Sequence, residues 1–222
     1  DVDTCKMAAY GGQLEVLQWL HANGCPWNEA TCEAAAYGGH LRVLQWAHSN
    51  GCPWDEEQLQ IAAGGGKVAV VRVMIEAGAD VNRAREKGRT PLFYAAQKGH
   101  EAVVRALIES GADVNKARNN GVTPLFMAAE KGHGAILRVL IEADADVIKG
   151  KTMYDGATPL CIGAQKGHEA VVRALIEAGT DVNKTMDDGV TPLYIAAHNG
   201  HEAVVRALIE LGADVNRATD DG

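Results

Sequence analysis

The sequence lacks both a long hydrophobic run and an excess of positive charge. Its most apolar stretch, VAVVRVMIEAGA at residues 68–79, is interrupted by Arg72 and Glu76 and is too short to span a bilayer. The net charge is −8, which argues against a nucleic-acid partner, because phosphate binding depends on clustered lysine and arginine. No secretory signal opens the chain. We therefore expect neither a membrane nor a nucleic acid as a partner.

Cysteine is scarce as well. Five cysteines, an odd number, in 222 residues are too few for a disulfide scaffold, and they favour a reducing, cytoplasmic environment. By contrast, 47% of the residues are hydrophobic and 23% are charged, which is typical of a globular protein with a large core.

Motifs for catalysis or cofactor binding are incomplete. The GGGK stretch at 64–67 lacks the full spacing of a phosphate-binding loop, and HEAVV, which occurs three times, lacks the second histidine of a zinc protease. No nucleophile has a recognisable base beside it. We therefore expect no catalytic, cofactor or metal site, and a protein that is not an enzyme. A structural role in a loop is expected for five histidines that recur at one register: His40, His100, His133, His168 and His201.

Internal repeats are the strongest signal. Cys5, Tyr10 and Trp19 recur 27 residues later, and TPL begins at residues 90, 123, 158 and 191. In every unit an opening glycine is followed twelve residues later by a closing glycine, which Asp144 replaces once. The intervening segment, such as 100–110, carries one apolar stripe at helical spacing. With Thr123 as a helix N-cap, each unit is predicted to be a turn, a short helix, a loop and a longer helix.

The segment DDGVTPLYIAAHNGHEAVVRALIELGADVN at 187–216 closely resembles the ankyrin repeat, a family defined by a 33-residue period and a TPL motif. The resemblance covers nearly the whole chain: four close repeats, one divergent repeat around 144–163, and two short repeats of a GCPW type. It implies an all-α fold with short β-hairpin fingers, arranged as a solenoid of about seven helix–turn–helix units. We expect a single solenoid over 1–222, with short-type repeats over 1–54 and standard-type repeats over 55–222.

The resemblance also implies a non-enzymatic scaffold that binds a protein partner through a concave face of finger tips and first helices. One alternative is a targeting segment of a larger multidomain protein, which could include an enzyme, and another is self-association through uncapped ends. The sequence does not identify the partner. Carried over by register, the candidate partner-binding residues are Tyr10, Tyr37, Lys87, Arg89, Tyr94, Lys98, Asn119, Asn120, Lys131, Tyr154, Asp155, Lys166, Asp187, Asp188 and His198. The family's asparaginyl hydroxylation motif matches Asn82, Asn115, Asn183 and Asn216.

The stretch NGCPW, at 23–27 and 50–54, raises the question of a metal or redox site. In the repeat register Cys25 takes an alanine position, and units stacked roughly 8–10 Å apart would hold Cys25 too far from Cys52 for a disulfide. Cys32 is expected to be a small core residue. The tryptophans Trp19, Trp27, Trp46 and Trp54 are expected to fill the core where the fingers are missing. A zinc or redox role for these cysteines remains the alternative.

Overall fold

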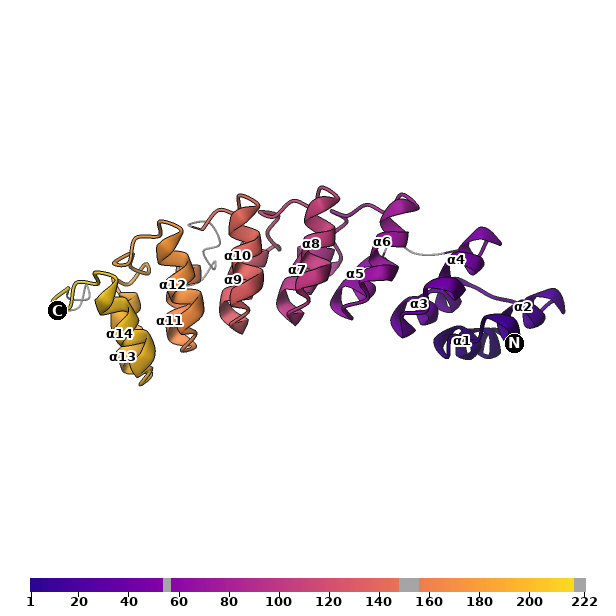
Figure 1. The fold of residues 1–222 in the computed structure, drawn as a ribbon, viewed down its shortest axis with the longest axis horizontal. Coiled ribbons are helices and arrows are strands. Elements are labelled where there is room, and N and C mark those ends of the chain that lie inside the picture. The colour runs from indigo at the N-terminus through magenta and orange to yellow at the C-terminus, as the bar shows by residue number, and fades with distance from the viewer. Residues whose placement is uncertain (54–56, 148–155, 218–222) are drawn as a thin grey trace. The chain divides into compact units, whose positions relative to one another are not determined.

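The computed structural model describes residues 1–53, 57–147 and 156–217. Over these ranges the protein has fourteen α-helices, one 3-10 turn and no strand. Figure 1 shows the helices following one another in pairs. The first helices of the seven pairs are α1 (Val2–Tyr10), α3 (Glu29–Gly38), α5 (Glu57–Gly64), α7 (Pro91–Lys98), α9 (Pro124–Lys131), α11 (Pro159–Gln165) and α13 (Pro192–His198). The second helices are α2 (Leu14–Ala22), α4 (Leu41–Ser49), α6 (Val68–Glu76), α8 (Glu101–Glu109), α10 (Gly134–Glu142), α12 (Glu169–Glu177) and α14 (Glu202–Glu210).

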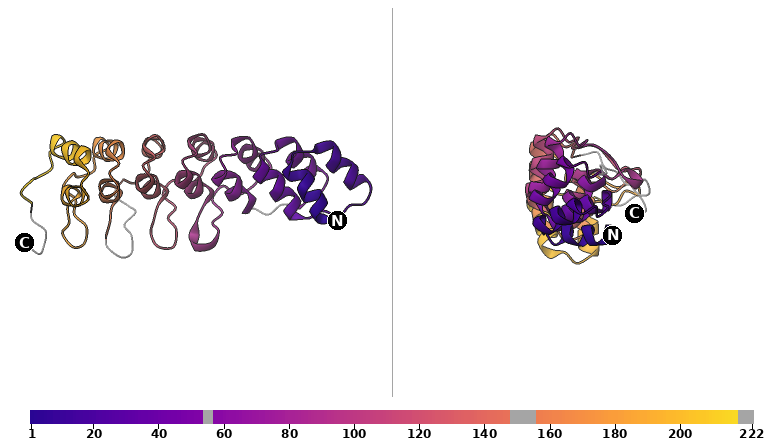
Figure 2. Two further views of the ribbon diagram at one scale, coloured as in Figure 1. Left: turned by 90° about the horizontal axis from the view of Figure 1, so that it is seen from below. Right: turned by 90° about the vertical axis from the view of Figure 1, so that its right-hand side faces the viewer.

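The chain divides into two compact units. Unit 1 comprises Asp1–Arg85 and Thr90–Ala112, and unit 2 comprises Glu86–Arg89 and Asp113–Gly222. Within each unit the first helices pack on first helices and the second helices on second helices, which gives the two layers visible in Figure 2. This boundary lies away from residue 54, where the short repeats are predicted to end, and the single-solenoid organisation stays a prediction.

Threonine begins four of the first helices. The Oγ1 atoms of Thr90, Thr123, Thr158 and Thr191 accept hydrogen bonds of 3.0–3.2 Å from the backbone N–H three residues later. Proline follows each threonine, where its missing N–H costs nothing because that N–H has no helical partner. The predicted N-cap at Thr123 is confirmed.

Histidine links each of four repeats to the preceding one. The Nε2 atoms donate to a carbonyl oxygen at the end of the neighbouring first helix: His40 to Tyr10, His100 to Gly64, His168 to Glu130 and His201 to Gln165, at 2.9–3.1 Å. These bonds confirm the predicted structural role for these four histidines. Lys67 takes the same place in the third repeat, against Gly39.

Alanine and leucine form the interior. The sequence predicts Leu125, Ala128 and Ala129 as a narrow apolar face, and all three are buried. Cys32 is buried as predicted, but Trp19 is 65% exposed, so its expected place in the core is wrong. Trp27 and Trp46 are half-buried, and their rings lie against each other at 5.4 Å on the second-helix layer of unit 1. Trp54 lies outside the described residues.

The expected β-hairpin fingers are turns without strands in the described ranges. In the finger of 113–123, one bond of 3.0 Å joins the N–H of Arg118 to the carbonyl of Val122, and a bond from Gly121 to Arg118 closes the turn. A single bond between the two arms is too short a ladder to form a strand pair. Lys87 and Asp144 adopt left-handed backbone conformations, at φ 63° and 61°. The sequence predicts that conformation for Asp144, which replaces a capping glycine.

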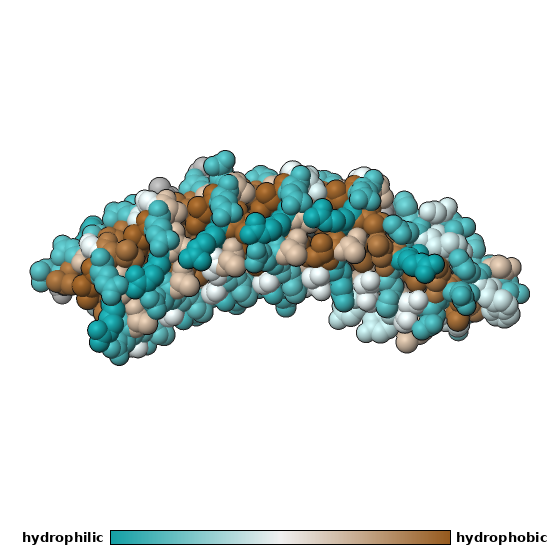
Figure 3. Space-filling model, viewed as in Figure 1, coloured by the Kyte–Doolittle hydropathy of each residue, from teal (hydrophilic) through white to brown (hydrophobic). Residues whose placement is uncertain are grey.

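Charged residues cover the second helices. Arg105 pairs with Glu101 in α8, and Arg173 joins α12 to α14 by binding Glu169 and Glu210, each at 2.8 Å. Figure 3 shows hydrophilic residues recurring along these helices, with hydrophobic residues beside them. Exposed pairs of this kind add little stability. Among the described residues, no helix combines the length and hydrophobicity needed to cross a membrane.

Candidate functional site

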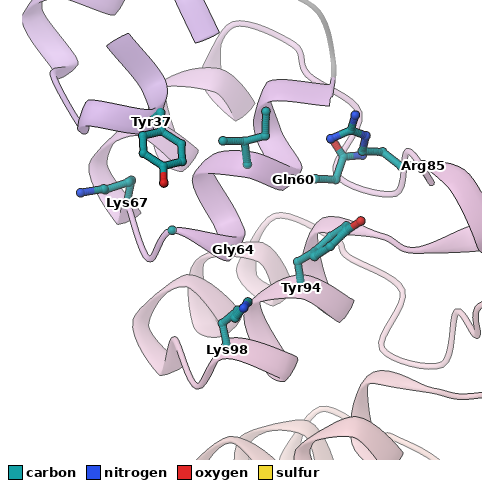
Figure 4. A pocket seen from close by; sticks show the side chains of 9 residues that line it. Tyr37, Gln60, Gly64, Lys67, Arg85, Tyr94 and Lys98 are labelled. Carbon is teal, nitrogen blue, oxygen red and sulfur yellow. The ribbon is translucent and has the colours of Figure 1, made fainter. Parts of the chain in front are cut away.

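A cavity of about 510 Å³ opens in unit 1 where α3, α5 and α7 follow one another. We call it the unit 1 pocket; Figure 4 shows its side chains. Its described lining residues are Tyr37, Gln60, Ile61, Gly64, Gly65, Lys67, Arg85, Tyr94 and Lys98.

The pocket lies where one side chain is missing from a repeated row. Gly64 holds the register position, two residues before the opening glycine, that Tyr37 holds in the previous repeat and Gln97 in the next. Gly65 aligns with Lys98 in the next repeat and with Gly38 in the previous one. A Cβ atom added to Gly64 would lie 3.7 Å from the Cβ of Tyr94, an ordinary van der Waals contact. The space beside Gly64 is therefore open, and its backbone is not strained.

Cationic groups dominate the lining. Lys67 lies just before α6, Lys98 ends α7 and Arg85 lies in the loop after α6. The described lining contains no aspartate or glutamate. Gln60 is almost fully buried: its Nε2 donates to the carbonyl of Arg83 at 2.7 Å, while its Oε1 has no hydrogen-bond partner. A buried amide oxygen without a partner is costly unless something donates to it. The pocket therefore offers positive charge to a ligand.

Tyrosines form two walls of the pocket. Tyr37 is 62% exposed, and its ring stacks on Tyr10 with centroids 6.0 Å apart. Tyr94 is half-buried, and its ring lies edge-on to that of Phe93, with the centroids 6.3 Å apart. Exposed tyrosines on a rigid backbone suit partner binding, because they give a large contact area and lose little conformational entropy.

The structure brings together some of the predicted partner-binding residues. Tyr37, Tyr94 and Lys98 line the unit 1 pocket, and Tyr10 stacks beside it. Tyr154 and Asp155 lie outside the described residues. The other described candidates lie outside this pocket: Lys87, Arg89, Asn119, Asn120, Lys131, Lys166, Asp187, Asp188 and His198.

The sequence analysis missed Gln60, Lys67 and Arg85 as lining residues. Gln60 lies in the middle of α5, and Arg85 lies just before the finger-tip turn of Glu86–Gly88, so neither falls on a position where family register places binding residues. The detectable signal is Gly64, which takes a register position that a large side chain holds in every other repeat.

Two predicted finger-tip residues support their own turns. Asn120 Oδ1 accepts from the N–H of Val122 at 3.4 Å, and Asp188 Oδ1 accepts from the N–H of Val190 at 3.1 Å. Asn120 also lines a smaller cavity of about 290 Å³ in unit 2, together with Arg118 and Glu130. This cavity carries both signs of charge, so it has a weaker preference for a charged ligand than the unit 1 pocket.

The asparagines of the hydroxylation motif bind neighbouring turns. Asn82 Nδ2 donates to the carbonyl of Gly111 at 3.1 Å, and Asn115 Nδ2 donates to that of Asp144 at 3.3 Å. Asn183 Oδ1 accepts from the N–H of Asp214 at 2.9 Å. For Asn216 the backbone N–H donates to Asp214. Modification of these four residues stays a prediction.

No cluster of three or more histidine, cysteine or acidic side chains suited to a metal ion occurs in the described ranges. The GGGK stretch closes α5 and forms the turn before α6, with Gly66 at φ 70°. All five cysteines are free thiols.

Comparison with protein families agrees with this architecture. A model of three ankyrin repeats matches residues 31–118, 59–151, 115–186 and 148–219, and a model of many ankyrin repeats matches residues 5–48. No curated protein matches the chain significantly. Because the matches extend from residue 5 to residue 219, the chain belongs to the ankyrin repeat family.

Proposed function

We propose that the protein is a non-enzymatic interaction scaffold whose unit 1 pocket receives an acidic side chain of a protein partner. Ankyrin repeats are in general protein-interaction modules, and the matched models contain no other kind of domain. The observation that carries the proposal is the pocket beside Gly64, which is lined by Lys67, Lys98 and two tyrosines.

Charge complementarity selects the occupant. A carboxylate that enters between Lys67 and Lys98 gains charge-assisted hydrogen bonds, which are about twice as strong as neutral ones. The whole chain carries a net charge of −8, so an acidic partner is repelled at long range and gains most at this local cationic site. The pocket is already formed, so little entropy is lost on docking.

Selection from a library of short random peptides displayed on phage tests this function. We expect the wild-type chain to enrich peptides that carry Asp or Glu beside an aromatic or aliphatic residue. Gly64→Gln introduces the side chain that Gln97 has at this position in the next repeat, and it fills the pocket. The selected peptides should then bind at least tenfold more weakly, a loss of about 1.4 kcal/mol of binding free energy. Gly64→Ala is the size control, because its methyl group leaves most of the cavity open.

Lys98→Ala should weaken the same peptides, whereas Lys166→Ala should not, because Lys166 shares the register of Lys98 and lies in unit 2. Peptides without acidic enrichment, or equal binding to wild type and Gly64→Gln, would contradict the proposal. Circular dichroism of each variant controls for folding.

The other readings have tests of their own. The full open reading frame decides whether these repeats are the targeting segment of a multidomain protein. Light scattering over a range of concentrations tests self-association through the end repeats. We place the scaffold in a reducing intracellular compartment, which the five free thiols support.

A further inference from the structure

Two thiols meet within the first repeat. Cys5, in the middle of α1, donates a hydrogen bond to Cys25, which lies in the turn after α2, and the sulfur atoms are 3.1 Å apart. Cys5 is fully buried, and Cys25 is partly exposed. A disulfide needs a sulfur–sulfur distance of about 2.05 Å, so a shift of roughly 1 Å is enough to join them.

The second repeat holds an equivalent pair 27 residues further on. Cys32 lies in α3 and Cys52 follows α4, and the nearby Cys52 thiol raises the pKa of the Cys32 thiol. Both are buried, at 0% and 2% exposure. Cys32 also lies 3.9 Å from the carbonyl oxygen of Cys52.

The standard repeats place leucine and alanine at these two registers. The third and fourth repeats, for example, have Leu59 with Ala79 and Leu92 with Ala112. Both positions change to cysteine together, in both short repeats. The two changes alter the core volume in opposite directions, because cysteine is smaller than leucine and larger than alanine. Their further effect is to place two thiols together within each short repeat.

We propose that Cys5 and Cys25 form a modification site: they are converted to an intrachain disulfide by exchange with a small-molecule disulfide such as oxidised glutathione. This assignment is independent of the scaffold function and adds a redox-dependent covalent link between α1 and the end of α2.

The exchange has two balanced steps. The Cys25 thiolate attacks one sulfur of the small disulfide, whose sulfur–sulfur bond breaks, and the released thiolate takes a proton. Cys5 then loses its proton and attacks the Cys25 sulfur, which releases the second small thiol. Two protein thiols are oxidised to one disulfide, and one small disulfide is reduced to two thiols.

The local environment favours Cys25 as the attacking group. The hydrogen bond that Cys25 accepts from Cys5 lowers the pKa of the Cys25 thiol. Burial, followed by the same hydrogen bond, raises the pKa of the Cys5 thiol to about 11. Cys25 is therefore both the more readily deprotonated thiol and the more exposed one. The buried Cys5 thiol is placed to attack the mixed disulfide on Cys25.

The second pair is expected to react more slowly. The hydrogen bond from Cys32 lowers the pKa of Cys52, but Cys52 is only 2% exposed and a small disulfide cannot reach it without local opening. Because the small disulfide reaches Cys25 more easily than Cys52, the Cys5–Cys25 disulfide should form before the Cys32–Cys52 disulfide.

Peptide mapping by mass spectrometry tests the proposal. The reduced full-length chain is incubated with oxidised glutathione, quenched with an alkylating agent at increasing times and digested without reduction. We expect a Cys5–Cys25 cross-linked peptide, a loss of two hydrogens from the intact chain, and full reversal by reduced glutathione. The melting temperature of the oxidised chain should rise by several degrees, because the bond closes a loop in the unfolded chain.

Cys25→Ala, which restores the residue of the standard repeats, should abolish the cross-link and the rise in melting temperature. Cys161→Ala, at a lone buried cysteine, should leave both unchanged. A persistent glutathione adduct on Cys25, a link between other cysteines, an earlier Cys32–Cys52 link, or no reaction would each overturn the assignment. The mapping of the wild-type chain decides these outcomes even if a variant fails to fold.

Discussion

At the scale of single residues, glycine and histidine connect one repeat to the next. Gly66 has φ 70°, a left-handed conformation that favours glycine, and the ring of His100 packs beside it. The same histidine donates to the carbonyl of Gly64. Glycine is therefore favoured at position 66 for two reasons: the backbone there is left-handed, and a side chain would collide with the ring of His100.

The effects of backbone conformation and ring contact can be separated with two glycine variants. Gly78 has φ 92° and nothing within 4 Å of an added Cβ, whereas a Cβ at Gly66 would lie 2.8 Å from His100 Nδ1. Gly78→Ala should lose about 1–2 kcal/mol of unfolding free energy from backbone strain alone. Gly66→Ala should lose roughly 1–3 kcal/mol more, because the ring must move. Urea denaturation measures both.

Replacing His100 by Ala in the Gly66→Ala background should recover part of the extra loss, since the clash is removed. Equal losses in Gly66→Ala and Gly78→Ala would show that the histidine ring yields freely, and the link between these repeats would then be weaker than its hydrogen bond indicates.

At the scale of helices, capping fixes where each first helix of the standard repeats begins. Thr123 is buried, and its Oγ1 accepts from the N–H of Phe126 at 3.1 Å. Thr123→Ala leaves that N–H without its partner and should cost about 0.5–2 kcal/mol of unfolding free energy. Thr123→Ser keeps the hydroxyl oxygen and is the matched control. If Thr123→Ser loses as much unfolding free energy as Thr123→Ala, the effect comes from the missing methyl group and not from the capping hydroxyl.

The helices could be predicted from sequence because their signals are local. The TPL start, the apolar stripe of 100–110 and the paired glycines define each helix without reference to the rest of the chain. The exposed position of Trp19 could not be predicted, because hydrophobicity does not show which face of a short repeat is covered. The fingers lack strands because too few backbone hydrogen bonds join the two arms of each finger.

The candidate site was predictable only in part, for a similar reason. Register predicts Tyr37 and Lys98 as binding residues because they follow the repeat, and both line the unit 1 pocket, while partner binding by them stays a prediction. The Cys5–Cys25 contact joins two positions within one repeat, whereas the sequence comparison considered equivalent positions in adjacent repeats. The pocket itself depends on an absent side chain at Gly64, which helix propensity and hydrophobic periodicity do not show and which only a register comparison of the repeats reveals.

At the scale of the whole chain, stability is transmitted between neighbours. Within unit 2, α10 packs against α9 and α12, and α12 packs against α14. In a repeat protein, stability is approximately the sum of repeat stabilities and nearest-neighbour interfaces. A defect in one repeat should therefore be felt most by the repeats that it contacts.

Leu137→Ala tests this locality. Leu137 is fully buried in α10, and removing its side chain should cost about 2–5 kcal/mol through lost burial and the cavity left behind. Hydrogen exchange should then accelerate most in α9–α12 and least in α1–α4, since only neighbouring interfaces carry the loss. Arg138→Ala, at the adjacent exposed position, should change unfolding free energy by less than about 0.5 kcal/mol and leave exchange unaltered. A uniform loss of protection across all fourteen described helices would mean that the chain unfolds as one cooperative block, because the interfaces between repeats would then outweigh the stability of any single repeat.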